Sequence, residues 1–180
     1  FRAADGWWAN KFGVQVGIKG FDFFGIEGLS VQAEFNLVRP FTYSHGSPIQ
    51  NYAHQDQALA HPLGANFYEG LLIGTYRKGD WEIRNHTSYT LKGDDEDDLN
   101  LGGDIFRSYV GPANNLGNFI GQGIRTEALQ NSLYLSYILD DQSDMRISLA
   151  YHFRHDIGEV QRPAHIIGLS IQSNFGDGYR

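Results

Sequence analysis

The segment from Leu29 to Leu37 constrains the fold of this chain most, because its apolar and polar residues alternate without interruption. It reads Leu-Ser-Val-Gln-Ala-Glu-Phe-Asn-Leu, with every odd position apolar and every even position polar. Successive side chains of a β-strand point to opposite faces, so this alternation predicts a strand with one apolar and one polar face. The same pattern recurs along the chain and predicts an all-β protein.

Seven segments predict strands of this kind. They cover residues 12–21, 29–39, 67–77, 81–91, 127–139, 145–153 and 165–175. Most approach the ~9–11 residues of a membrane-crossing strand, whereas strands of soluble sheets typically have ~5–6. All five prolines fall between the segments, at Pro40, Pro48, Pro62, Pro112 and Pro163. Because proline cannot donate to a strand ladder, these positions support the boundaries.

The connections between the segments are alternately short and long. Residues 22–28, 78–80 and 140–144 form the short ones, and residues 40–66, 92–126 and 155–164 form the long ones. Short turns at one end and long loops at the other are typical of outer-membrane barrels. We therefore expect an antiparallel transmembrane β-barrel in the bacterial outer membrane. A soluble lipocalin-like barrel or β-sandwich is the alternative, because its strands also alternate.

In the membrane interpretation the two faces of each strand have different surroundings. We expect lipid contact for Val14, Val16, Ile18, Val31, Phe35, Ile83, Ile147, Leu149 and Ile171. We expect a lumen-facing position for Gln32, Glu34, Arg84, His86 and Arg146, because charged side chains need water or partners. Ser148 has the same alternation as this second set and is expected to point into water.

The strand count bears on the extent of the domain. Bacterial barrels have an even number of strands and at least eight, so seven are too few. Residues 105–110 offer a weak further candidate, and the chain opens with Trp7 and Trp8 already close to its start. We expect residues 1–180 to be a single outer-membrane β-barrel domain. We expect it to be the C-terminal portion of a larger barrel, without that barrel's N-terminal strands.

Composition excludes several classes of protein. The chain has no cysteine, which rules out disulfides and thiolate chemistry. Its net charge of −7 argues against nucleic acid as a partner, because phosphate contacts need lysine and arginine. No apolar run approaches the ~20 residues that a transmembrane helix requires.

The loop of residues 40–66 carries a distinctive motif. It reads Tyr43-Ser-His45, then Asn51-Tyr52-x-His54, and then Leu59-Ala-His61-Pro-Leu-Gly-Ala-Asn66. In this motif the chain resembles the Wzi-type capsule-assembly family of the outer membrane, and most closely its Bacteroidetes branch, which includes the gliding-motility protein RemB. The strand at Trp81 and the terminal Asn174-Phe175-x-x-x-Tyr179 match that family in style.

The resemblance implies a non-catalytic barrel for attachment or organisation of surface polysaccharide, of the capsule-assembly or gliding-adhesin type. It singles out His45, Asn51, Tyr52, His54, His61 and Asn66 as candidate ligand-binding residues. Each of them could instead pin the long loop by hydrogen-bonding its backbone. An accessory subunit of a larger outer-membrane complex and a transport channel are the alternative functions. The expected partners are outer-membrane lipid, surface polysaccharide and other outer-membrane proteins.

We expect no catalytic residue, metal or cofactor. The histidines of the loop are nine and seven residues apart, without the close pairing of usual zinc sites. The acidic run of residues 94–98 could bind calcium but better fits a solvated loop tip, since it lacks the glycine and final glutamate of an EF-hand. A triad of Ser44 or Ser148 with histidine and Asp156 would require these residues to meet in space.

The loop of residues 40–66 is expected to be ordered and to fold inward or across the barrel mouth. It contains Phe41, Tyr43, Ile49 and Tyr52, and leaving such apolar surface in water costs roughly 25 cal/mol per Å². Long loops without the composition of disorder are usually functional.

Overall fold

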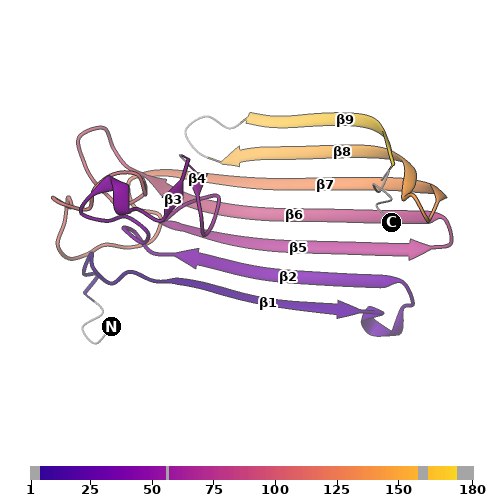
Figure 1. The fold of residues 1–180 in the computed structure, drawn as a ribbon, viewed down its shortest axis with the longest axis horizontal. Helices are drawn as coiled ribbons and strands as arrows, with labels where there is room; N and C mark the ends of the chain where they lie inside the picture. Colours follow the sequence, from indigo (N-terminus) through magenta and orange to yellow (C-terminus); the bar gives the residue numbers. More distant parts are fainter. Residues whose placement is uncertain (1–4, 56, 158–161, 174–180) are drawn as a thin grey trace, which may run out of the picture.

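The computed structural model describes residues 5–55, 57–157 and 162–173, and its fold is all-β. Seven strands lie side by side in one antiparallel sheet (Figure 1). In chain order these are β1 (Gly13–Phe21), β2 (Leu29–Val38), β5 (Phe67–Lys78), β6 (Trp81–Asp94), β7 (Ile124–Asp140), β8 (Met145–Ile157) and β9 (Arg162–Gln172), and each pairs with the next. The prediction of seven antiparallel strands is therefore confirmed. The prediction that all prolines lie between strands is wrong for Pro163, which lies in the edge strand β9 opposite His155, so the connection expected over residues 155–164 is shorter than predicted.

The long loops contain short elements that the sequence pattern did not predict. A two-stranded hairpin of β3 (Ala53–His54) and β4 (Gln57–Ala58) lies in the first long loop, after the single turn η2 (Pro48–Gln50). The turn between β1 and β2 contains η1 (Phe23–Gly25). The predicted terminal segment of residues 174–179 lies outside the described residues.

The weak strand candidate at residues 105–110 is wrong. Side chains within and just before the segment hydrogen-bond its backbone instead: the Phe106 N–H donates to Asp104 Oδ1 at 2.8 Å, and the Val110 N–H donates to Ser108 Oγ at 3.1 Å. Local bonds of this kind compete with a strand ladder. Ile105 is buried, so the apolar residue that suggested a strand packs in a loop core instead.

The sheet is open in the part of the chain that the structure describes. β1 and β9 each have one neighbouring strand, so they form the two edges, and the expected closed barrel is not present among these residues. Both edge strands run in the same direction, because six antiparallel pairings lead from β1 to β9 and each pairing reverses the direction. None of the described helices is long and apolar enough to cross a membrane.

The register gives the sheet two chemically distinct faces. All nine residues expected to be lipid-facing share one face, which we call the apolar face. Gln32, Glu34, Arg84, His86 and Arg146 share the opposite face, which we call the polar face. The apolar face is exposed: Ile18 shows 70% and Leu169 76% of its surface.

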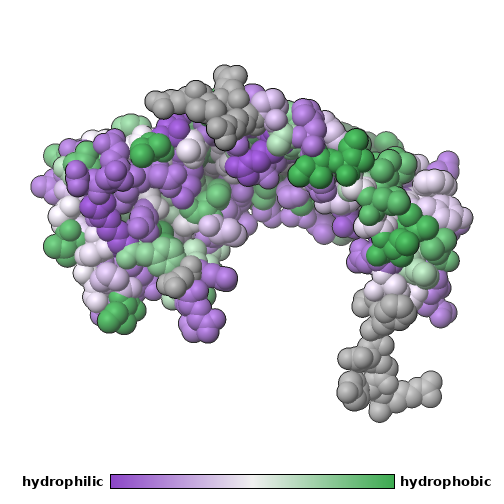
Figure 2. Space-filling model, turned by 90° about the horizontal axis from the view of Figure 1, so that it is seen from above, coloured by the Kyte–Doolittle hydropathy of each residue, from purple (hydrophilic) through white to green (hydrophobic). Residues whose placement is uncertain are grey.

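The long loops gather at one end of the sheet in a body that we call the crown, made of residues 39–55, 57–66 and 95–123 (Figure 1). A cluster of buried apolar residues fills it, formed by Val38, Ala65, Phe67 and Ile105. Figure 2 shows the crown as a thick body at one end, with a hollow beneath the neighbouring strands. The buried core of the described residues thus lies at the end of the sheet and not against its apolar face.

Candidate ligand groove under the crown

A groove of about 760 Å³ runs along the polar face where β5, β6, β7 and β8 meet the crown. Its walls include carboxylate, imidazole, hydroxyl, amide and guanidinium groups from Glu69, His86, Ser88, Gln130 and Arg154. These residues lie together because each occupies a polar-face position in its strand. Apolar side chains such as Leu71 and Ile157 complete the lining.

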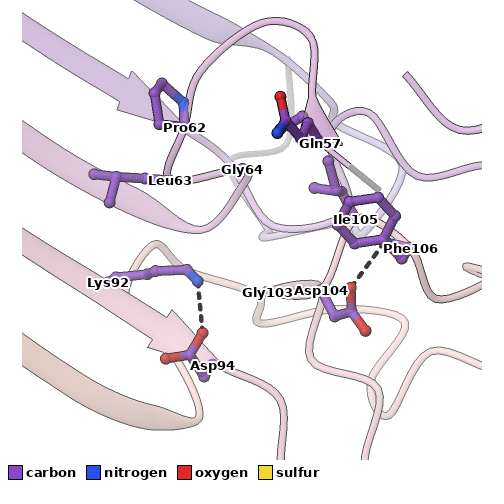
Figure 3. Close-up of a pocket in the computed structure, with 11 residues that line it drawn as sticks. Gln57, Pro62, Leu63, Gly64, Lys92, Asp94, Gly103, Asp104, Ile105 and Phe106 are labelled. Atoms are coloured by element: carbon purple, nitrogen blue, oxygen red, sulfur yellow. Dashed lines mark hydrogen bonds and ion pairs between the residues drawn. The ribbon is translucent and has the colours of Figure 1, made fainter. Parts of the chain in front are cut away.

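A second hollow of about 490 Å³ adjoins this groove and shares Leu63 and Lys92 with it. Figure 3 shows Lys92 pointing toward Asp94, with the ammonium 2.7 Å from the carboxylate, across from Pro62 and Leu63 of the crown. The crown therefore forms the roof of both spaces, and the polar ends of β5 and β6 form their floor.

The charges of the groove are mostly neutralised by neighbours. Arg154 Nε lies 2.9 Å from Asp156 Oδ1, and Lys92 is paired with Asp94 as described. A surface of paired charges, hydroxyls and amides offers hydrogen-bond donors and acceptors without a large field of one sign. Such a lining suits a ligand rich in hydroxyl groups better than a multiply charged one.

His61 joins the crown to the floor of the groove. Its Nδ1 accepts a hydrogen bond from the Leu63 N–H at 3.2 Å, so the ring proton belongs on Nε2, which lies 3.0 Å from Glu69 Oε2. Glu69 also accepts from Asn36 Nδ2 at 3.0 Å, and the imidazole stacks on Phe67 with 4.5 Å between ring centres. His61 therefore fastens the loop to Glu69, which lines the groove, although the His61 side chain itself is not part of the lining.

Asn66 is wholly buried and serves as a pin between three segments. Its Nδ2 donates to the carbonyl oxygens of Gly93 (2.8 Å) and Gln122 (2.9 Å), and its Oδ1 accepts from the Gly121 N–H at 2.7 Å. Its φ of 61° lies in the left-handed region, which asparagine tolerates better than most residues. A side chain on Gly93 would approach Gln122 O to 2.0 Å, so only glycine fits there. Asn66 contacts no open space where a ligand could bind.

The other loop-motif residues lie in the outer part of the crown. Asn51 is buried, and its Oδ1 accepts from the His45 N–H at 2.6 Å. Tyr52 packs near Tyr43, with ring centres 5.7 Å apart, and its own side chain is half exposed. His45 and His54 have exposed side chains, and none of these four residues lines the groove. Of the six candidate ligand-binding residues, His61 is the one that hydrogen-bonds a lining residue of the groove in the part of the chain that the structure describes, and that residue is Glu69.

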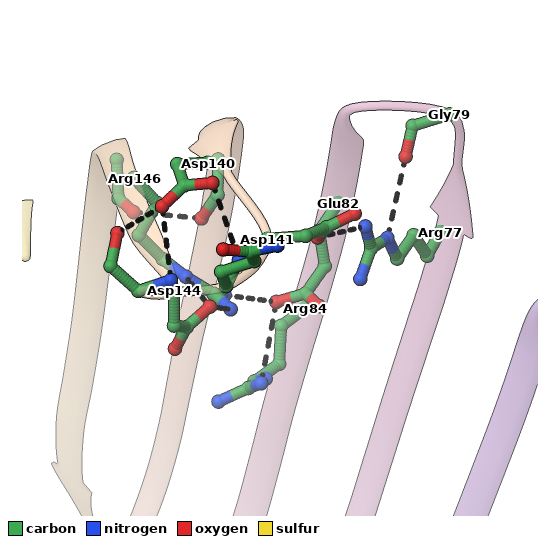
Figure 4. A network of polar contacts seen from close by, with 12 residues as sticks. Arg77, Gly79, Glu82, Arg84, Asp140, Asp141, Asp144 and Arg146 are labelled. Atoms are coloured by element: carbon green, nitrogen blue, oxygen red, sulfur yellow. Dashed lines mark hydrogen bonds and ion pairs between the residues drawn. The ribbon is translucent and has the colours of Figure 1, made fainter. Parts of the chain in front are cut away.

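The predicted lumen-facing residues lie in three separate places. Gln32 and Glu34 hydrogen-bond each other at 3.0 Å on β2, away from the groove, whereas His86 lines the groove on β6. Arg84 and Arg146 belong to a network at the short-turn end of the sheet (Figure 4). There Arg146 Nη1 lies 2.8 Å and Arg84 Nη2 3.3 Å from the same oxygen of Glu82.

The Glu82 network ties the short turns to the sheet. Arg146 also binds Asp144 in the turn between β7 and β8, and Arg77 lies 2.5 Å from Asp141 in the same turn (Figure 4). Glu82 is only 8% exposed, so its charge depends on these arginines. We assign Arg84 and Arg146 to this structural network and not to ligand contact.

The first two aspartates of the acidic run, Asp94 and Asp95, are engaged by neighbouring groups. Asp95 Oδ1 accepts from the backbone N–H groups of Leu101 (3.1 Å) and Gly103 (2.7 Å), and Asp94 pairs with Lys92. Among the described residues no three histidine, aspartate or glutamate side chains converge as a metal site would require. The run therefore shapes the crown loop.

The serines considered for a triad are engaged elsewhere. Ser44 Oγ donates to the Phe41 carbonyl at 2.8 Å, and Ser148 Oγ lies 2.7 Å from Ser136 Oγ. His152 Nδ1 instead lies 2.9 Å from Ser132 Oγ. The arrangement of Ser44 or Ser148 with histidine and Asp156 is therefore not formed.

Several groove residues did not stand out in the sequence. No motif contains Glu69, Lys92, Gln130 or Arg154, and only their positions on the polar side of each alternating strand could have suggested them.

Comparisons with protein-family models, with curated proteins and with solved structures find no match for this chain.

Proposed function

We propose that this chain forms part of a non-catalytic outer-membrane β-barrel that holds surface polysaccharide in the groove beneath its crown. The proposal rests on the chemistry of the two faces, the tilt of the strands relative to the apolar band, and the groove. The resemblance of the loop motif to the Wzi-type family points the same way.

The exposed apolar face supports a membrane environment. In a soluble barrel or sandwich the apolar face of the sheet packs inside, whereas here the buried core lies in the crown. Contiguous apolar surface on this scale marks a contact with lipid or protein. Lipid is the occupant that fits a face spanning all seven strands.

The drift of the apolar residues across the sheet is the observation that carries the proposal. The register leads from Val16, in the middle of the apolar residues of β1, to Pro163 in β9. The middle of the apolar residues of β9 is Leu169, which lies six residues beyond Pro163 toward the short turns. Six strand pairings lead from β1 to β9, so the middle of the apolar residues shifts by one residue at each pairing.

This drift of one residue per strand corresponds to a defined tilt. A residue rises ~3.3 Å and strands are ~4.8 Å apart, so the strands tilt by about 35° from the normal of a level apolar band. Strands of closed barrels tilt by ~35–45° from the barrel axis. A level membrane and tilted strands together explain the drift.

Aromatic residues flank the apolar band, as they do at the two interfaces of membrane barrels. Trp81 and Tyr137 lie in T-shaped contact at the short-turn end, with ring centres 5.0 Å apart. Tyr68 lies near the crown, and its ring stacks at 6.1 Å on Phe35, which lies closer to the middle of the band. Both pairs are on the apolar face.

Three polar residues interrupt the band, and their contacts limit the penalty of placing them in lipid. Asn131 Nδ2 donates to Thr87 Oγ1 at 2.8 Å, and Thr87 Oγ1 donates to Asn85 Oδ1 at 3.0 Å. Polar groups that satisfy one another are far less costly in hydrocarbon than isolated ones.

The crown favours a binding role over free conduction. His61, Pro62 and Leu63 cover the crown end of the polar face, and Asn66 holds this loop in place. A lumen roofed in this way retains a ligand better than it passes solutes. The alternative role as an accessory subunit predicts instead that the chain co-purifies with other outer-membrane proteins in mild detergent.

An array of bacterial surface polysaccharides tests the binding role, with the purified chain in detergent as the probe. We expect binding to at least one polysaccharide, weakened about tenfold by Gln130→Ala or His86→Ala, which each remove a hydrogen-bonding side chain from the groove. Arg77→Ala, at the far end of the sheet, is the control and should bind like the parent. Binding that is absent, or equally weakened by all three substitutions, would exclude the groove as the site.

A further inference from the structure

We propose that Arg39 and the cavity around it bind the phosphate of an anionic lipid headgroup at the crown-side rim of the apolar face. This inference rests on the proposed membrane location. It concerns a site separate from the polysaccharide groove, on the other face of the sheet.

A cavity of about 600 Å³ lies between the rim of the apolar face and the crown. Leu37 and Tyr68, which are opposite each other on β2 and β5, form its floor. Phe12 lines one side, and Phe119 and Ile120 of the crown overhang it. The cavity therefore opens on the face that we assign to lipid.

The overhanging part of the crown presents apolar groups on this side of the sheet. Phe119 and Leu116 expose more than half of their surface. A side chain on Gly121 would approach Leu91 Cδ2 to 2.5 Å, so this part of the crown lies directly against the apolar face. Exposed apolar residues beside a headgroup-sized cavity are typical of a surface that lies in a membrane interface.

Arg39 brings a positive charge without a carboxylate partner into this cavity. Its Nη2 donates to the Asn118 carbonyl at 3.1 Å, and the guanidinium lies 5.8 Å from the centre of the Phe12 ring. Its Nε is buried without a hydrogen-bond partner. None of the ion pairs among the described residues involves Arg39.

The chemistry of a guanidinium selects phosphate as the ligand group. Its planar array of donors matches two phosphate oxygens, and a partly buried cation without a partner attracts an anion. Asp5 also lines the cavity, where its Oδ1 accepts from the Trp7 N–H at 3.1 Å. Its charge opposes an anion, so a ligand with one negative charge fits better than one with several.

The height of Arg39 identifies a lipid as the source of the phosphate. With strands tilted by about 35° and an apolar band ~25 Å tall, the edge of the band lies about five residues from its middle. On β2 the middle falls near Glu34, and Arg39 is five residues beyond it toward the crown. Arg39 therefore lies at headgroup level, with Leu37 and Tyr68 below it to contact the acyl chains.

Native mass spectrometry of the chain in detergent tests this site, with phosphatidylglycerol and phosphatidylcholine of identical acyl chains as the probes. We expect phosphatidylglycerol to be retained at about tenfold lower concentration than phosphatidylcholine. Arg39→Gln should abolish the preference, and Asp5→Asn should strengthen it. Arg77→Gln, at the opposite end of the sheet, should leave it unchanged.

One further variant and one competition experiment keep the outcome decisive. If Arg39→Gln does not fold, Arg39→Lys decides, since it keeps the charge without the planar donors and should retain only part of the preference. Equal retention of both lipids, or a preference that survives loss of Arg39, would overturn the proposal. Displacement of phosphatidylglycerol by equimolar inorganic phosphate would assign the site to a soluble anion instead.

Flotation with phosphatidylcholine vesicles separates this inference from the proposed function. A chain that floats with the vesicles and has no headgroup preference would refute only the Arg39 site. A chain that does not float would refute the membrane location itself.

Discussion

Asn66 and Gly93 hold each other by two hydrogen bonds, although 27 positions separate them in the chain. The Gly93 N–H donates to the Asn66 carbonyl at 2.9 Å, and Asn66 Nδ2 donates to the Gly93 carbonyl at 2.8 Å. This pair joins the start of β5 to the end of β6, and it sets the position of the crown over the sheet.

Asn66→Ala should therefore loosen the crown. The substitution leaves the buried Gly93 and Gln122 carbonyls and the Gly121 N–H without their partner, and it strains a left-handed backbone. We expect a loss of about 2–4 kcal/mol in the free energy of unfolding, measured by denaturant titration. Asn66→Gly keeps the backbone freedom but loses the same hydrogen bonds, so it should be destabilising too, by less. An Asn66→Ala variant as stable as the parent would contradict the role of the pin.

The histidines of the loop motif should differ in their importance for stability. His61→Ala removes the contact with Glu69 and the stacking on Phe67, and should lower the free energy of unfolding by about 1–2 kcal/mol. His45→Ala changes an exposed side chain and should alter it by less than about 0.5 kcal/mol. Equal effects in the same titration would show that the contacts of His61 do not stabilise the fold.

A substitution at the centre of the Glu82 network should lower the free energy of unfolding more than a substitution at its edge. Glu82→Ala removes the shared carboxylate from Arg146 and Arg84, and we expect it to cost about 2–4 kcal/mol. Arg84→Ala removes a half-exposed partner and should cost less than about 1 kcal/mol. Thermal unfolding of the two variants measures the difference, and similar shifts in Tm would argue against a buried network.

An arginine should be tolerated on one face of the sheet and not on the other. Leu149 and His86 both lie near the middle of the band, on the apolar and the polar face respectively. Leu149→Arg should destabilise the membrane-inserted form by about 2–4 kcal/mol, because it places a charge at mid-depth in lipid. His86→Arg should have a much smaller effect. Folding titrations into liposomes compare the two, and equal losses would count against the membrane location.

The strands and their faces were predictable from the sequence because both follow from alternation. Val31 and Glu34 obey the period of two that a pleated strand imposes, and no tertiary contact overrides it. Ser148 shows the limit of this reasoning. Alternation placed it correctly on the polar face, but it is only 6% exposed because Ser136 lies against it.

The crown was less predictable because its structure depends on contacts between distant segments. Phe41 is buried as the composition of the loop suggested, yet Ile49 in the same loop is 95% exposed. Asn66 was predicted to contact a ligand, but its side chain hydrogen-bonds the backbone of residues 93 and 121–122 instead. The groove residues Gln130 and Arg154 come from separate strands, so no local motif marks them.

Quenching by lipid tests the central claim most directly, and the absence of native cysteine makes it simple to perform. Single cysteines at Val16 and Leu149 on the apolar face, and at Glu34 and His86 on the polar face, place a fluorophore at the same height on both faces. In vesicles of brominated phosphatidylcholine, we predict strong quenching at Val16 and Leu149 and weak quenching at Glu34 and His86. Quenching that is equal on the two faces, or absent from both, would contradict a membrane-embedded sheet with its apolar face in lipid.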